Sequence, residues 1–243
     1  MSSTTRTFLA GCTTMAAALS AVFLLTAAKG GPTHANFDEI TVGRINIVEP
    51  NGQKRMIIAN RAQFPGAFDQ GNEIARPDRR DFAGMLFLDE EGNENGGFIQ
   101  KGSRSPDGKI SAGLSLTFDR YRQDQALQLL HTNNEQSGAS SITINDVPYF
   151  QNSGIDSMEQ FHKIAQSLPE SERGAYWAKL ASENKISNTR VKLGTTPGKT
   201  SALMLSDANG RTRLRLMVSA SGKAAIEMLD ETGKVVKTIG PDQ

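Results

Sequence analysis

Residues 201–239 read SALMLSDANGRTRLRLMVSASGKAAIEMLDETGKVVKTI, and this stretch decides the expected fold. Four short segments rich in apolar residues lie in it, at 203–205, 213–218, 226–229 and 235–236, and the stretch as a whole alternates apolar and polar residues. Short polar turns containing Gly210, Gly222 or Gly233 separate them. A period of two is typical of a strand with one buried face, and strands joined by glycine turns pair with their neighbours. The stretch therefore predicts an antiparallel meander.

The N-terminal half of the chain shows the same pattern. Residues 44–58 contain two alternating segments joined at Asn51-Gly52, a pair that tolerates the positive φ of a tight hairpin. Residues 40–47 alternate with a phase slip at Gly43, which predicts one strand with a glycine bulge. Further strands are expected at 85–88, 96–99, 114–118, 126–130 and 142–144. The polar stretches 133–141 and 193–200 are expected to be loops.

Between these two β regions the apolar period changes to that of a helix. Phe161, Ile164 and Leu168 share one helical face until Pro169, where a second helix can begin. The turn glycines have no constant period, so a counted repeat is less favoured than a sandwich or barrel. The expected fold is mainly β, an antiparallel meander that is sandwich or barrel-like, with a two-helix insertion at 156–185.

An export segment is expected over residues 1–35, which leaves a single domain at 36–243. Residues 8–28 carry no charge, and their strongest apolar part is as long as a signal-peptide core. Cleavage is expected, after Ala35 or after Ala28, and an uncleaved membrane anchor is the alternative. The stretch before Cys12 matches a lipobox, but the apolar core follows this cysteine instead of preceding it.

Composition excludes several classes of function. The chain of 243 residues has 27 Lys and Arg against 26 Asp and Glu, so it carries no basic surface for nucleic acid. A single cysteine can form neither an internal disulfide nor a cysteine metal site. No nucleophile elbow or phosphate-binding loop is present in the sequence. No cofactor is therefore predicted.

Four carboxylates are candidate catalytic residues, at Glu49, Glu94, Asp119 and Asp124. A short turn would bring Asp119 and Asp124 together, and paired carboxylates carry out glycoside hydrolysis. Arginine-flanked carboxylates are more often ion pairs, and many hairpins have this composition. The spacing permits an acid–base site without requiring one.

A candidate calcium site lies in the turn 89–97. Asp89, Glu91, Asn93 and Glu94 supply the oxygen ligands that hard cations prefer. The pattern differs from an EF-hand, and acidic residues and Asn are also common in plain hairpin turns. A solvated turn is the alternative.

Candidate ligand-binding residues are Arg76, Arg79, Arg80 and Trp177. The arginines lie in the long irregular stretch 63–81, and long loops on a β framework often carry binding sites. Trp177 is the only tryptophan and lies in the second expected helix. A solvated charged loop and a tryptophan that packs in the core are the alternatives.

Several motifs resemble an uncharacterised family of bacterial exported or membrane-anchored proteins. They are RINIVEPNG at 44–52, RMII at 55–58 and GNENGG at 92–97. The resemblance covers about half of the chain and leaves out the helical insertion. It implies a cell-envelope location and a β-rich fold. It implies no activity and no catalytic residue.

The sequence favours a non-catalytic cell-envelope binding module that uses polar loop tips at 63–81, 89–97 and 119–125. The expected partner is a protein or glycan of the envelope, in the periplasm or outside the cell. Nucleic acid is not expected, a membrane is contacted only through the N-terminal segment, and an oligomer is possible. The alternative function is a carboxylate-based hydrolase acting on carbohydrate.

Overall fold

The computed structural model describes residues 34–149 and 154–241. Residues 1–33 of the expected export segment therefore lie outside the described residues. The chain divides into two units, Met1–Thr41 and Val42–Gln243, and every helix and strand described below belongs to the second. Residues 34–41 contain neither helix nor strand. Among the described residues, no helix is both long and apolar enough to cross a membrane.

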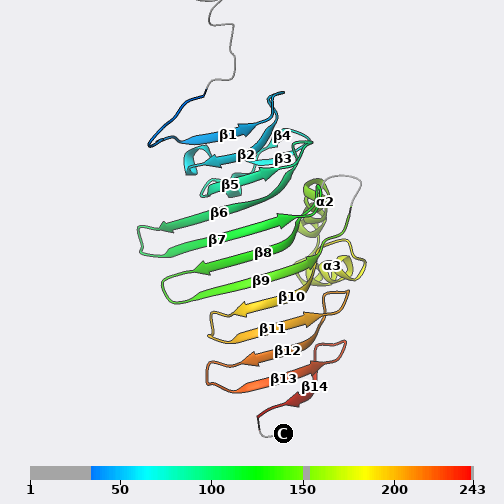
Figure 1. The fold of residues 1–243 in the computed structure, drawn as a ribbon. Helices are drawn as coiled ribbons and strands as arrows, with labels where there is room; N and C mark the ends of the chain where they lie inside the picture. The colour runs from blue at the N-terminus through cyan, green and yellow to red at the C-terminus, as the bar shows by residue number, and fades with distance from the viewer. Residues whose placement is uncertain (1–33, 150–153, 242–243) are drawn as a thin grey trace, which may run out of the picture. The chain divides into compact units, whose positions relative to one another are not determined.

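Twelve strands form one antiparallel sheet whose order follows the chain, with β3 and β4 left out between β2 and β5 (Figure 1). They are β1 (Arg44–Val48), β2 (Lys54–Ala59), β5 (Ala83–Leu88), β6 (Glu94–Arg104), β7 (Ile110–Asp119), β8 (Gln125–Asn133), β9 (Gly138–Asp146), β10 (Asn188–Thr195), β11 (Ser201–Ser206), β12 (Thr212–Val218), β13 (Ala224–Leu229) and β14 (Val235–Ile239). A small hairpin, β3 (Ala67–Asp69) with β4 (Asn72–Ile74), forms a second sheet.

The mainly β fold, the antiparallel meander and the two-helix insertion are confirmed. The sandwich and barrel forms were wrong, because the twelve strands continue as a single open sheet. Three strand predictions also failed. Residues 138–141, expected as part of a loop, belong to β9. Residues 40–43 carry no strand, and β1 begins only at Arg44. Residues 193–195, expected as a loop, belong to β10, where Leu193 and Gly194 are paired on both sides.

Glycine turns join the strands as the sequence predicts. Gly52 has φ +87° and donates its N–H to the carbonyl of Glu49 at 2.8 Å, which closes the β1–β2 hairpin. Gly210 has φ +76° and bonds the carbonyl of Asp207 at 3.0 Å in the β11–β12 turn. These positive φ values suit glycine, and the resulting tight turns keep each strand beside its sequence neighbour.

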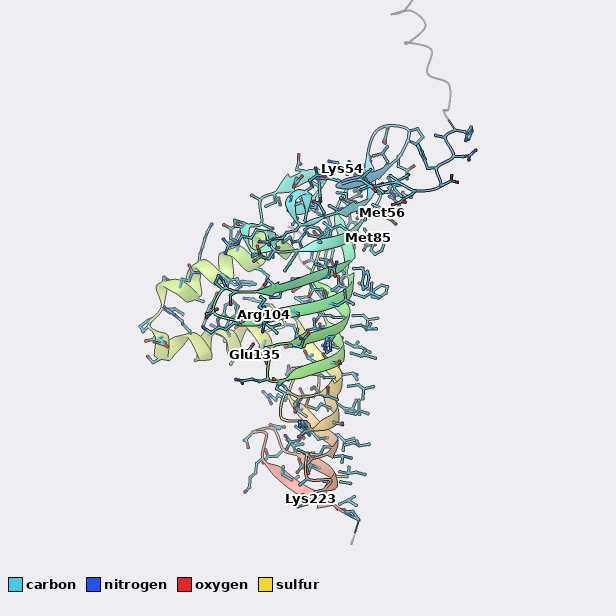
Figure 2. The ribbon with its side chains drawn as sticks, turned by 90° about the vertical axis from the view of Figure 1, so that its left-hand side faces the viewer. Lys54, Met56, Met85, Arg104, Glu135 and Lys223 are labelled. Atoms are coloured by element: carbon cyan, nitrogen blue, oxygen red, sulfur yellow. The ribbon has the colours of Figure 1, made fainter. Side chains whose placement is uncertain are left out.

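Helices α2 (Gly154–Ser167) and α3 (Glu170–Ser182) connect β9 to β10. Pro169 separates them, because a proline ring cannot continue the first helix but can precede the second. Buried Asn188 donates from Nδ2 to the carbonyl of Ala181 at 3.1 Å and so ties the end of α3 to β10. Both helices lie on one side of the sheet (Figure 2).

The hydrophobic core is small and lies on one face of the N-terminal strands. Ile57, Ala59, Leu86 and Leu88 are buried there under Phe68 of the β3–β4 hairpin. Two short 3₁₀ helices flank this hairpin, η1 (Arg61–Gln63) and η2 (Pro77–Arg79). Residues 60–82 thus cover the same side of the sheet as the helices, which we call the covered face. The opposite side is called the open face.

Candidate functional site

An uninterrupted row of apolar side chains crosses the open face, with one residue in each of the twelve strands. Each member is the direct register partner of the next. In strand order the row is Ile45, Ile58, Met85, Phe98, Leu116, Leu129, Ile142, Leu193, Leu203, Leu216, Ile226 and Ile239. Register partners point to the same face of a sheet, so these side chains form one ridge.

A second row runs beside the first, two residues away along each strand. It comprises Ile47, Met56, Phe87, Gly96, Phe118, Leu127, Ile144, Val191, Leu205, Leu214, Met228 and Lys237. Residues two apart in a strand share a face, so both rows lie on the open face. Lys237, in the last strand, is the single charged residue in the two rows.

The open face is exposed in this chain. Fourteen large apolar strand residues that are at least 36% exposed point to it: Ile45, Ile47, Phe98, Leu114, Phe118, Leu129, Ile142, Ile144, Leu193, Leu205, Leu216, Val218, Ile226 and Met228. Figure 2 shows side chains projecting from this side of the strands, with Met85 labelled beside it and the helices on the other side. Soluble monomers rarely expose apolar patches larger than a few hundred Å². This face therefore has the composition of a binding surface.

Two shallow hollows lie along this surface. One, of about 530 Å³, is lined by Phe98, Leu129 and Ile142 among others, and the second, of about 480 Å³, by Leu216 and Ile226. Leu193 lines both hollows, so they are contiguous across the middle of the sheet. When two sheets pack face to face, the side chains of one sheet fill hollows of this kind in the other.

The covered face has a different character toward the C-terminus. There one line of register partners across β9 to β14 is mostly polar and comprises Thr143, Lys192, Met204, Arg215, Glu227 and Thr238. Arg215 donates to the Glu227 carboxylate, with Nε at 2.9 Å. A polar face of this kind suits solvent, so the apolar open face is the one that needs a second layer.

The three loops that the sequence singled out do come together at one end of the N-terminal strands. The backbone N–H of Gln70 donates to Oδ1 of Asn93 at 2.9 Å, which joins the first loop to the second. Arg122 of the third loop forms an ion pair with Asp69 at 3.1 Å, and Tyr121 bonds Glu91. The polar groups of these loops are thus largely bonded to one another.

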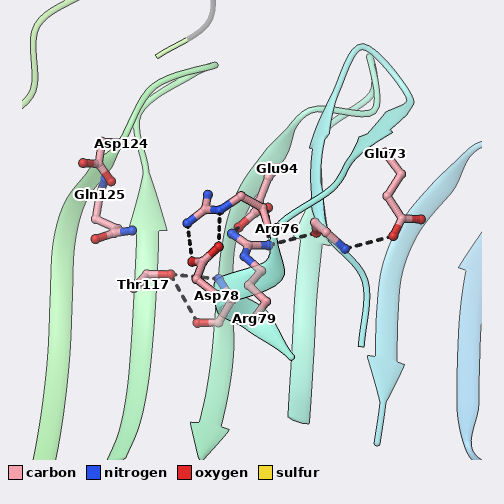
Figure 3. Close-up of polar contacts among 10 residues, drawn as sticks. Glu73, Arg76, Asp78, Arg79, Glu94, Thr117, Asp124 and Gln125 are labelled. Carbon is pink, nitrogen blue, oxygen red and sulfur yellow. Dashed lines mark hydrogen bonds and ion pairs between the residues drawn. The ribbon is translucent and has the colours of Figure 1, made fainter. Parts of the chain in front are cut away.

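The predicted arginines line one cavity of about 610 Å³ beside η2, together with Arg61. Arg79 makes a two-pronged ion pair with Glu94 at 2.8 and 2.9 Å, and Arg76 makes one with Asp78 at 2.8 and 2.9 Å (Figure 3). Arg80 lies 4.0 Å from Asp81. Acidic partners from the same chain therefore offset most of the positive charge at this cavity.

Three of the four predicted carboxylates lie in this region. Burial, followed by the charges of Glu94 and Asp124, raises the pKa of Asp119 from 3.8 to about 8. Its Oδ1 is buried and has no hydrogen-bond partner within the described part of the chain. Glu49 is separate and pairs with Arg55 at 3.3 Å. Asp119 is protonated at neutral pH, as a general acid would be, but the residues that line the arginine cavity include no carboxylate.

The predicted calcium ligands are used in the structure of their own turn. Asp89 accepts hydrogen bonds from the backbone of Glu91 and from the backbone and side chain of Asn93, all at 2.9 Å. Glu94 points instead to Arg79. In the ranges that the structure describes, no group of three or more His, Cys, Asp or Glu side chains is arranged to hold a metal.

Trp177 lies in α3, on a different element from the arginines. Its ring contacts His162 of α2 edge-on with centroids 5.0 Å apart, and Tyr176 lies beside it at 5.6 Å. The contact joins α2 and α3, and Trp177 is half-buried there.

No family model matches the chain, and no curated protein matches it significantly. The resemblance to exported bacterial proteins therefore has no independent support from these comparisons. Sequence reasoning missed the two apolar rows, although their signal was present. Alternation showed one apolar face on nearly every strand, and the helical insertion is too short to cover twelve strands.

Proposed function

We propose that this chain is an exported, non-catalytic binding module of the bacterial cell envelope, and that it binds a protein surface through its open face. The observation that carries the proposal is that fourteen exposed, large apolar strand residues share this one face. Burying apolar area is the main favourable contribution to most protein association. The uncharged segment at residues 8–28 and the resemblance to envelope proteins support the location.

The open face is a better binding surface than the loop tips on which the sequence prediction centred. Arg79, Arg122 and Gln70 already bond other loops of the same chain. A ligand there would have to replace these hydrogen bonds and ion pairs, which yields little net free energy. Covering the apolar rows breaks no hydrogen bond of the chain, so each buried side chain contributes fully.

The geometry favours binding over the hydrolase alternative. Glycoside hydrolysis needs two carboxylates that face each other across an accessible cleft. Here Glu94 is held by Arg79 with both side chains less than 15% exposed, and Asp119 is buried beside them. Glu49 belongs to a separate ion pair.

Photo-crosslinking in intact cells tests the proposal. The full chain would carry the photoreactive residue benzoylphenylalanine in place of Phe98, which is 44% exposed on the open face. A second variant would carry it at Tyr121, which is 46% exposed in the loop cluster. We expect a protein adduct at position 98. An adduct at 121 with none at 98 would favour the loop tips and contradict the proposal.

A further inference from the structure

We infer that the surface covering the open face is the same face of another copy of this chain, so that the working form is a homo-oligomer. This inference rests on the proposed function and names its partner. Two copies with their open faces together are the smallest closed arrangement. The contact would turn two single-layer sheets into one two-layer β structure.

The apolar rows extend across the whole sheet. The first row has a member in all twelve strands, from edge strand β1 to edge strand β14. Strand spacing of about 4.8 Å makes this ridge roughly 55 Å long. Small ligands occupy compact pockets, whereas a partner that covers the whole ridge must be equally long. A second copy has the same length and the same spacing between ridge residues.

The area is sufficient for a stable complex. Residues two apart in a strand are about 6.7 Å from each other, so two rows form a band about 13 Å wide. A band of these dimensions covers about 700 Å² on each copy, close to the roughly 800 Å² per partner of standard interfaces. Leu114 and Val218 extend the band on one side with a third, partial row.

Charge favours a copy over a membrane surface. Lys237 is the one charged residue in the two rows, and the chain carries a formal net charge of +1. Surfaces that bind anionic lipid combine apolar residues with several Lys or Arg residues around them. Apart from Lys237 in the edge strand, the two bands carry no charge, so they meet with little repulsion and few unpaired charges between the copies.

The open face has no second layer within the described part of the chain. Domains bury an apolar sheet face against a second layer, and the described chain places its helices and its loop 60–82 on the other side. The second layer must then come from outside this sheet. An equivalent sheet supplies an apolar face that interdigitates, at the roughly 10 Å separation of packed sheets.

Sedimentation of the purified full chain tests the inference. We expect the mass of two or more chains at micromolar concentration. Leu129→Asp lies at the centre of the first row, where the native side chain is 40% exposed, so the monomer tolerates a carboxylate there. We expect this substitution to raise the dissociation constant by at least 100-fold. Val236→Asp is the matched control, because Val236 is 63% exposed and lies outside the two rows. It should leave the mass unchanged.

Circular dichroism establishes that both variants retain the strand content of the native chain. If Leu129→Asp fails to fold, the photo-crosslinking experiment at position 98 still tests the inference, because the peptides in the adduct identify the partner. Adducts between two copies support the inference. The inference is overturned if the wild-type chain is a monomer. It is also overturned if the adduct at position 98 joins lipid, a different protein, or another part of the same copy. A different protein leaves the proposed function standing, whereas the absence of any protein adduct removes both.

Discussion

Asp119 provides a quantitative test of how the loop cluster is built. Burial and the neighbouring Glu94 and Asp124 raise its pKa to about 8 in the folded chain, against an ordinary value of 3.8. Between these values the unfolded chain has released the proton and the folded chain has kept it. The contribution of this carboxyl group to stability is therefore fully present below about pH 4, and it is lost as the pH rises to about 8.

The size of the effect follows from the same two pKa values. A difference of about 4 pKa units corresponds to about 5 to 6 kcal/mol at 1.36 kcal/mol per unit. Although Oδ1 is buried, the residue as a whole is only partly buried, so solvent screening reduces the effect. We expect about 2 kcal/mol for the pH-dependent part. Asp119→Asn removes the titration, so this variant should gain about that much stability relative to wild type between pH 4.5 and pH 8.

Urea unfolding at pH 4.5, 6 and 8 measures this difference for the two proteins. Any constant cost of placing an amide at position 119 cancels when the stability difference between the two proteins is compared across the three pH values. Glu90→Gln is the control, because it removes the same charge from an exposed residue of a neighbouring turn. A stability difference between Asp119→Asn and wild type that stays constant from pH 4.5 to pH 8 would refute the reasoning.

Three further predictions concern the same N-terminal strands and are checked by chemical denaturation. Arg79→Met leaves Glu94 as an unpaired carboxylate in a site only 14% exposed, and should cost about 3 kcal/mol. Gly84→Ala should cost about 3 kcal/mol, because its φ is +138° and a Cβ would lie 2.2 Å from a backbone oxygen; Gly52→Ala, where no atom is near, should cost only about 1 kcal/mol. Asn93→Ala should cost about 2 kcal/mol, because the buried side chain bonds both its own turn and the β3–β4 hairpin. Equal costs for the two glycines, or a neutral Asn93→Ala, would contradict these assignments.

Local signals in the sequence were sufficient for most strands. Asn51-Gly52 and Asn209-Gly210 determine hairpins because positive φ and a tight turn are local properties. The prediction failed where pairing overrides composition. Gly194 has weak strand character on its own, yet it pairs with Ser141 of β9 on one side and with Ala202 of β11 on the other. Residues 40–43 show the reverse case, since alternation alone does not make a strand.

Less of the candidate site was predictable. The sequence identified Arg79, Glu94, Asp119 and Asp124, and the structure places these residues in one region. Their mutual pairing depends on how loop 63–81 folds over the sheet, which no short motif determines. Arg79 and Glu94 are 15 residues apart and bond only because η2 lies against the start of β6.

The open face explains why a correct reading of the strands led to an incorrect overall shape. Leu214 and Leu216 flank Arg215, and Ile226 and Met228 flank Glu227. From this alternation the sequence predicted one buried face for each strand. A sandwich or barrel satisfies that requirement within one chain by folding the sheet onto itself. Short turns such as those at Gly210 and Gly222 pair each strand with the next one, and in this sheet β1 and β14 do not pair with each other, so the sheet stays open. In the homo-oligomer that we propose, the pattern of burial belongs to the assembled protein: the sequence specifies which face is buried, and the partner sheet supplies the second layer.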